Sequence, residues 1–112
     1  MKEQEKTLST RYYSKRQEKA VAKSLNGRRT ANSGATAFQK GDVVLADWLI
    51  ECKTSTNFRQ SASIPKKWIE KNAEEAFAMG KHHSAVAFNY GPDEPNYYVI
   101  SEKEFKRLLE ID

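Results

Sequence analysis

One stretch, residues 41–55 (GDVVLADWLIECKTS), constrains the fold of this chain more than any other. Two short apolar runs, residues 42–46 and 48–52, flank a turn around Ala46-Asp47. Their Val, Leu, Ile and Trp content is typical of β-strands. The stretch therefore predicts a β-hairpin.

The second strand of this hairpin carries charge within an apolar context. Glu51 and Lys53 are two positions apart, so their side chains share one face, whereas Ile50 and Cys52 point to the other. Strand pairing can bring Asp42 beside them. The alternative makes Asp42 a turn residue and the other two an ion pair on a solvated face. The strand (WLI) is too apolar for a surface edge, which favours a functional cluster.

Two carboxylates and an ammonium indicate phosphate chemistry. Mg²⁺ binds proteins through one or two carboxylates plus phosphate oxygens. A neighbouring lysine can orient or activate a water nucleophile, or stabilise charge on a transition state. We therefore expect Mg²⁺ at Asp42 and Glu51, with Mn²⁺ able to substitute.

Residues 14–25 predict a first helix, because Val21, Ala22 and Leu25 fall on one face. Asn26-Gly27 suits its end. Glu18 lies along the inward stripe and therefore needs a partner, although helix margins often hold such a glutamate. Residues 28–39 predict a brief strand and a loop.

A second helix is predicted from Ser63-Ile64-Pro65, with Ser63 as its cap, to Met79-Gly80. Strands are expected over residues 84–90 and 96–100, and a capping box at residues 101–104 begins a last helix. The apolar residues expected to face inward from these two helices are Ile69, Ala73, Ala76, Phe77, Phe105, Leu108 and Leu109.

The element order predicts an α/β fold, a mixed sheet flanked by helices. With 112 residues the chain holds one domain, which we place at residues 14–112 after a flexible basic segment at 1–13. No apolar run approaches the roughly 20 residues of a membrane span, and no signal core begins the chain, so a cytoplasmic location is expected. The single cysteine, Cys52, excludes an intramolecular disulfide and any site built of several cysteines.

Positive charge is concentrated at the front of the chain. Residues 1–40 hold ten Lys or Arg against three Glu, a balance of +7, whereas residues 41–112 have a balance of −3. A basic segment suits nucleic acid, with ordinary solubilising charge as the alternative. The residues expected to contact DNA are Lys15, Lys19, Arg28, Arg29, Lys66 and Lys67.

These features together resemble the PD-(D/E)XK nuclease superfamily, most closely its archaeal-type Holliday junction resolvases. The resemblance spans residues 14 to about 90 and depends on Glu18, Ser33-Gly34, Gly41-Asp42-Val43-Val44 and Glu51-Cys52-Lys53. Gly41 stands where the superfamily usually has proline.

The resemblance implies a restriction-endonuclease-like core. It also implies that Asp42 and Glu51 bind Mg²⁺, that Lys53 serves the attacking water and that Glu18 supports the metal from the helix. Ser33 would lie close to the scissile phosphate.

Other candidates are assigned structural roles. Adjacent histidines diverge, so His82-His83 is expected in a loop and not at a metal. Cys52 lacks a paired histidine and is expected to be a buried structural thiol. Pro92-Asp93 imitates the superfamily signature but lies in a predicted turn.

The resemblance therefore implies a Mg²⁺-dependent endodeoxyribonuclease that resolves four-way DNA junctions, and its compact size would suit a phage or archaeal recombination gene. Symmetric nicking needs two active sites, so a homodimer is expected. We place its interface around Phe88, Tyr90, Tyr97, Tyr98 and the last helix. The alternatives are a restriction or repair endonuclease of the same superfamily acting on duplex DNA, and a DNA-binding module without catalysis.

Overall fold

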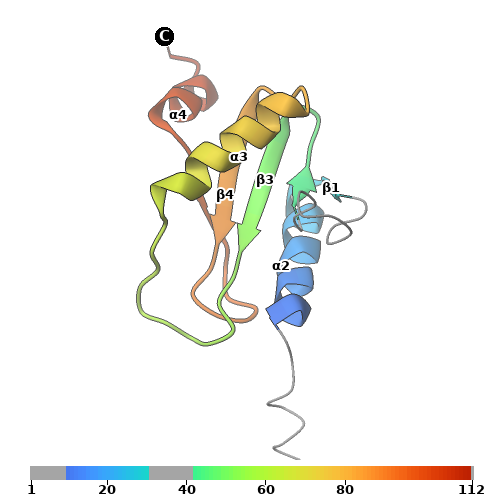
Figure 1. Ribbon diagram of the computed structural model, residues 1–112, viewed down its shortest axis with the longest axis vertical. Coiled ribbons are helices and arrows are strands. Elements are labelled where there is room, and N and C mark those ends of the chain that lie inside the picture. The colour runs from blue at the N-terminus through green and yellow to red at the C-terminus, as the bar shows by residue number, and fades with distance from the viewer. Residues whose placement is uncertain (1–9, 31–41, 112) are drawn as a thin grey trace, which may run out of the picture.

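The computed structural model describes residues 10–30 and 42–111. Within these residues, three helices and five strands follow one another (Figure 1). Their bounds are α2 (Thr10–Leu25), β1 (Arg28–Arg29), β2 (Val43–Val44), β3 (Trp48–Lys53), α3 (Lys66–Ala78), β4 (His83–Phe88), β5 (Tyr97–Val99) and α4 (Glu102–Leu109).

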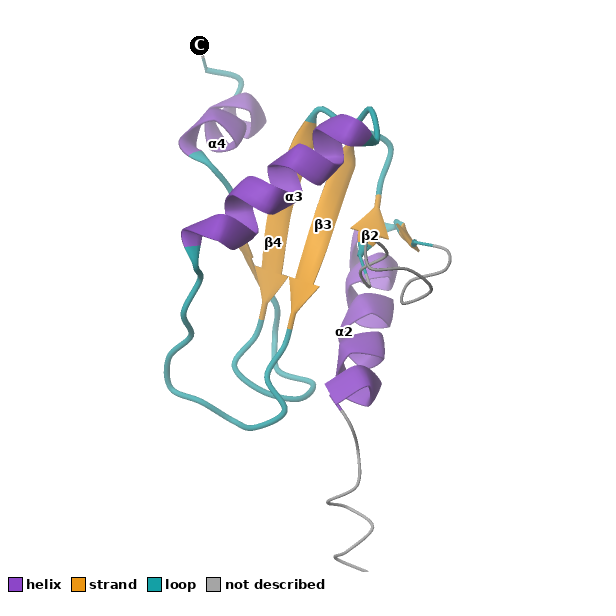
Figure 2. Ribbon diagram, viewed as in Figure 1, coloured by secondary structure: helices purple, strands orange, loops and turns teal. Residues whose placement is uncertain are grey.

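All five strands form one sheet in the order β1-β2-β3-β4-β5. Neighbouring strands are antiparallel except β3 and β4, which are parallel. A parallel pair needs a crossover, and α3 provides it (Figure 2). The predicted α/β fold with a mixed sheet flanked by helices is confirmed.

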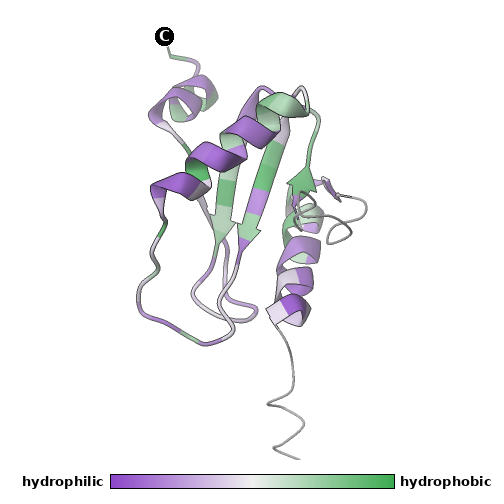
Figure 3. Cartoon of the chain, in the orientation of Figure 1, coloured by the Kyte–Doolittle hydropathy of each residue, from purple (hydrophilic) through white to green (hydrophobic). Residues whose placement is uncertain are grey.

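Helices cover both faces of this sheet. On one face Val21 of α2 packs with Val43, Ile50, Ala85 and Ala87. On the other face Val44 and Leu49 pack with Ala76 of α3. Hydropathy follows these layers, because β3 and β4 are largely apolar while the outward side of α3 is polar (Figure 3). The predicted hairpin of β2 and β3 is confirmed, with Val43 opposite Ile50.

The first helix begins at Thr10, earlier than the sequence indicated, so residues 10–13 are helical rather than part of a flexible segment. The predicted segment 1–9 lies outside the described residues.

Helix α3 ends where predicted, next to Met79, but departs from prediction at its start and on its buried face. It begins after Pro65, with no side-chain cap, so Ser63 does not cap it. Its buried positions are Asn72 and Ala76, whereas Phe77 is 84% exposed. The buried face is rotated because Asn72 Nδ2 donates hydrogen bonds to the carbonyls of Leu49 and Ala85, anchoring α3 to β3 and β4 through a polar contact.

The last helix has the predicted cap, since Ser101 Oγ accepts a hydrogen bond from the backbone N–H of Glu104 at 3.1 Å. Its apolar residues do not face inward as expected. Phe105, Leu108 and Leu109 are each more than half exposed. Within the described residues, no helix is long and apolar enough to cross a membrane.

Gly27 permits a close approach between the end of α2 and β2. A Cβ at this position would lie 2.8 Å from the carbonyl oxygen of Val44 and would also collide with the side chain of Leu45. The backbone oxygen belongs to a paired strand and cannot move freely.

We expect Gly27→Ala to lower the free energy of unfolding by about 1–3 kcal/mol, the usual cost of overpacking. Urea denaturation would measure the change, with the exposed Ser24→Ala as a control on the same helix. An unchanged Gly27→Ala midpoint would show that α2 and β2 separate without cost.

Candidate functional site

Strand pairing brings the three residues of the predicted cluster to one face of the sheet. In the β2–β3 register Val44 pairs with Leu49 and Val43 with Ile50, so Asp42 stands opposite Glu51 by continuation. Asp42 and Glu51 are each 5% exposed. Directly opposed residues have Cβ atoms about 4.5–5.5 Å apart. The register thus places two buried acidic residues opposite one another.

Lys53 completes the cluster. Its Nζ lies 3.1 Å from Glu51 Oε2 and 4.5 Å from the ring centroid of Trp68 on α3. The ammonium is thus held between a carboxylate and an aromatic face, which attracts cations. About a third of the Lys53 side chain remains exposed, so the cation is open to a ligand.

A pocket of about 460 Å³ opens beside this cluster, between β3 and α3. It is lined by Glu51, Lys53, Lys67, Trp68, Glu70, Lys71 and Glu74. Acidic groups and three lysines share its wall. A site of this composition can hold a cation and an anionic ligand together, as phosphoryl chemistry requires.

Cys52 lies on the opposite face from Glu51 and packs against the Val21 cluster. Burial raises the pKa of this thiol, and the negative charges of Asp42, Glu18 and Glu51 raise it further. A thiol that resists deprotonation is a poor nucleophile. The geometry supports the structural role predicted for Cys52.

Glu18 is buried as predicted but has a different partner. It follows the inward face of α2, and Arg29 Nε lies 3.3 Å from its Oε1. Arg29 stands opposite Val43, which packs against α2. Glu18 therefore pairs with Arg29, and its negative charge, like those of Asp42 and Glu51, acts on the Cys52 thiol.

The donor set fits Mg²⁺ through two carboxylates. Within residues 10–30 and 42–111, no group of three or more His, Cys, Asp or Glu side chains is arranged to hold a metal ion. Mg²⁺ commonly takes only one or two carboxylates and completes its shell with water and phosphate oxygens. The opposed pair of Asp42 and Glu51 meets that requirement.

The predicted DNA-contacting residues lie in separate places. Lys67 lines the pocket beside Lys53, and Lys66 is one residue earlier on α3, 3.6 Å from Glu70. Arg29 pairs with Glu18, which reduces its availability for phosphate. The other three, Lys15, Lys19 and Arg28, are exposed on α2 and β1. Ser33 lies outside the described residues.

Sequence reasoning missed two residues that shape the site. Trp68 supports the ammonium of Lys53. Gln17 is 4% exposed, and its Nε2 donates to the carbonyls of Lys53 and Ala87, tying α2 to the ends of β3 and β4. Its position four residues before Val21, on the same stripe, was the available signal. Nothing local to α3 indicates that Trp68 meets Lys53.

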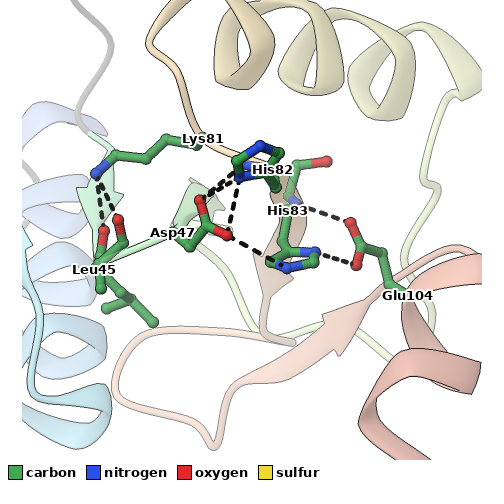
Figure 4. A network of polar contacts seen from close by, with 8 residues as sticks. Leu45, Asp47, Lys81, His82, His83 and Glu104 are labelled. Atoms are coloured by element: carbon green, nitrogen blue, oxygen red, sulfur yellow. Dashed lines mark hydrogen bonds and ion pairs between the residues drawn. The ribbon is translucent and has the colours of Figure 1, made fainter. Parts of the chain in front are cut away.

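The two histidines belong to a polar network at the other end of β3 (Figure 4). His83 is in β4 and not in a loop, and its Nδ1 lies 2.7 Å from Glu104 Oε1. His82 Nδ1 lies 2.9 Å from Asp47 Oδ1, a hydrogen bond that lowers the pKa of Asp47. Lys81 Nζ donates to the Leu45 carbonyl in the β2–β3 turn. The network joins this turn and α4 to β4.

The Pro92-Asp93 motif, which imitates the superfamily signature, also has a structural role. Asp93 has a left-handed backbone (φ 62°) within the turn, and its carboxylate accepts hydrogen bonds from Arg16 on α2.

Comparisons with known proteins give no match to a family model, a curated protein or a solved structure. The assignment of function therefore depends on the residues and their geometry.

The buried position of Glu18 makes the stability of the fold depend on pH. Burial raises the pKa of Glu18, although Arg29 and Lys15 lower it in part. The folded state therefore binds this proton more tightly than the unfolded state, and the associated stability is lost as pH rises through the folded pKa. A glutamine at position 18 cannot ionise, so the Glu18→Gln variant does not lose this stability as the pH rises.

We expect the free energy of unfolding of Glu18→Gln, relative to wild type, to increase between about pH 4 and about pH 7. Urea denaturation at both pH values would measure it, with the exposed Glu110→Gln as control. A relative decrease would mean that the ion pair with Arg29 outweighs burial.

Proposed function

We propose that this protein is a Mg²⁺-dependent endodeoxyribonuclease that hydrolyses DNA phosphodiesters at the cluster of Asp42, Glu51 and Lys53. The observation that carries the proposal is the β2–β3 register, which opposes Asp42 to Glu51 and leaves Lys53 on the same face. Two carboxylates and a lysine with that spacing are the site residues of the PD-(D/E)XK superfamily that the sequence resembles. The β-sheet order and the α3 crossover are compatible with a restriction-endonuclease-like core.

Each residue has a physical role in this reaction. Asp42 and Glu51 would hold Mg²⁺, which supplies charge stabilisation at the phosphate oxygens. Lys53 orients the attacking water and stabilises negative charge developing on the phosphate. Glu51 and Trp68 restrict the ammonium to one position, so that less ordering is needed when substrate binds.

Charge supports DNA as the substrate. The net charge is +4, with the excess of Lys and Arg before residue 41. Lys67 and Lys71 line the pocket beside the cluster, and no carboxylate among the described residues forms an ion pair with either. These lysines can accept the phosphates that flank the one to be cut.

We further propose that the substrate is a four-way junction and that the protein acts in the cytoplasm. Symmetric cutting needs two active sites and therefore two copies of the chain. The exposed apolar side chains of β5, of α4 and of the residues just after α4 are available to join them: Tyr97, Tyr98, Phe105, Leu108, Leu109 and Ile111. Phe88 and Tyr90 of the predicted interface are partly buried, and their rings contact that of Tyr97.

We expect Lys53→Ala and Asp42→Asn each to reduce DNA cleavage by roughly 10²-fold or more, because each removes a group acting on the reacting phosphate. DNA binding should persist, and in Asp42→Asn should tighten, because a repelling carboxylate is lost. The assay uses a labelled four-way junction and a matched linear duplex, with Mg²⁺ or EDTA. Lys103→Ala, on the exposed side of α4, is the matched control.

The outcomes separate the competing hypotheses. Paired, symmetric nicks in the junction alone, lost with EDTA and with Lys53→Ala, would support junction resolution. Cutting of both substrates would retain the nuclease and reject the junction preference. Binding without cutting in any metal, unchanged by Asp42→Asn and Lys53→Ala, would favour the DNA-binding module.

We also expect the protein to form a dimer that Leu108→Lys disrupts. Burial of a leucine side chain contributes about 1.5–3 kcal/mol. The dimer dissociation constant should therefore rise by roughly tenfold or more, which sedimentation equilibrium would measure. Lys103→Ala on the same helix is expected to leave it unchanged. A monomeric wild-type protein at all concentrations would reject this interface.

A further inference from the structure

We propose that a second pocket, beside the candidate active site, binds a phosphate group of the nucleic-acid backbone. This inference rests on the proposed function, because the phosphate is taken to belong to the bound DNA strand. The pocket has a volume of about 330 Å³ and lies under the long loop between β3 and α3.

The charge of this pocket has one sign. Two cations, Lys53 and Arg59, line it, and no Asp or Glu does. Four residues that carry hydroxyl groups also line it: Thr54, Ser55, Ser61 and Ser63. Phosphate oxygens in protein–DNA complexes are bound by this combination of basic and hydroxyl side chains. The pocket is therefore complementary to a phosphate and unfavourable for a cation.

Arg59 is held in a defined position with donors to spare. Its Nε donates to Ser55 Oγ at 2.9 Å, and its backbone N–H donates to the carbonyl of Tyr90 at 2.8 Å. No carboxylate among the described residues pairs with it, and its two terminal NH₂ groups have no partner there. A guanidinium fixed through Nε can still offer paired donors to a phosphate.

The loop that carries Arg59 contacts the connection between β4 and β5. Gly91 has a φ of +154°, and a Cβ on it would press against Phe58. The absence of a side chain at Gly91 lets Phe58 pack there, next to the Arg59–Tyr90 hydrogen bond.

The two pockets share a boundary. Lys53 and Trp68 line both of them, one with the Glu51 carboxylate and the other with Arg59. A DNA strand that places one phosphodiester beside Lys53 can therefore reach Arg59 with a neighbouring phosphate. Such a contact fixes the register of the strand at the active site and carries no base specificity.

The test is DNA binding without metal, so that cleavage cannot contribute. Fluorescence anisotropy of a labelled duplex, in EDTA, is followed at increasing NaCl. We expect Arg59→Gln to weaken binding roughly three- to tenfold and to reduce the slope of log K against log salt by about 0.9, the value for one phosphate contact. The exposed Arg107→Gln on α4 is the charge-matched control and should change neither quantity.

Two further variants separate charge from loop structure. Arg59→Lys retains the cation and should keep the salt slope. Ser55→Ala removes the hydroxyl that accepts a hydrogen bond from Arg59 Nε and does not change the charge, so it should likewise keep the salt slope. If Ser55→Ala lowers the slope as much as Arg59→Gln does, the loop and not the Arg59 charge is responsible, and the inference is wrong.

The source of the phosphate is distinguished by a second titration, in which inorganic phosphate is added and the fluorescence of Trp68 is followed, with Trp68→Phe as blank. Saturation that requires Arg59, in a protein that binds no DNA, would support a phosphate pocket and reject the nuclease. If the protein binds and cleaves DNA but Arg59→Gln and Arg107→Gln have equal salt slopes, the phosphate pocket is rejected. The proposed nuclease function is then retained. Binding of neither ligand would reject both.

Discussion

Six cross-strand pairs, from Trp48 with His83 to Lys53 with Phe88, join β3 and β4 in parallel. A parallel pair cannot close through a tight turn, so the chain must cross over the sheet before β4 begins. Helix α3 makes this crossover and covers one face, which leaves the other face for α2. Strand β3 is consequently hydrogen-bonded on both sides and covered on both faces. Every side chain on it must pack or find a polar partner.

This constraint makes the charges on β3 informative. A buried carboxylate loses hydration, and the loss is offset only by a counter-charge, hydrogen bonds or a metal. Glu51 has Lys53 on its own face, while Glu18 has Arg29 on the opposite face. Glu18 and Glu51 therefore have different basic partners, and the negative charges of both act on Cys52. Glu51 and Lys53 line a pocket, and we propose the chemistry there for that reason.

Prediction from sequence succeeded where the signal was local. The period-2 pattern of residues 48–53 fixed which side chains share a face, and the cap at Ser101 follows from its spacing to Glu104. Prediction failed where a distant partner decides the outcome. Asn72 is buried because two strand carbonyls bind it, and Phe77 is exposed as a consequence. His83 extends β4 beside Glu104, which no local pattern indicates.

The sequence by itself determined the hairpin, the common face of Glu51 and Lys53, and the inward position of Glu18, because strand and helix periodicities act over a few residues. The tertiary structure decided which groups meet. It set Asp42 opposite Glu51 through the strand register, gave Glu18 to Arg29, and placed Trp68 under the Lys53 ammonium. Those contacts depend on the face of the sheet that each helix covers. That choice belongs to the packing of the whole chain, because both faces of β3 must be buried at once.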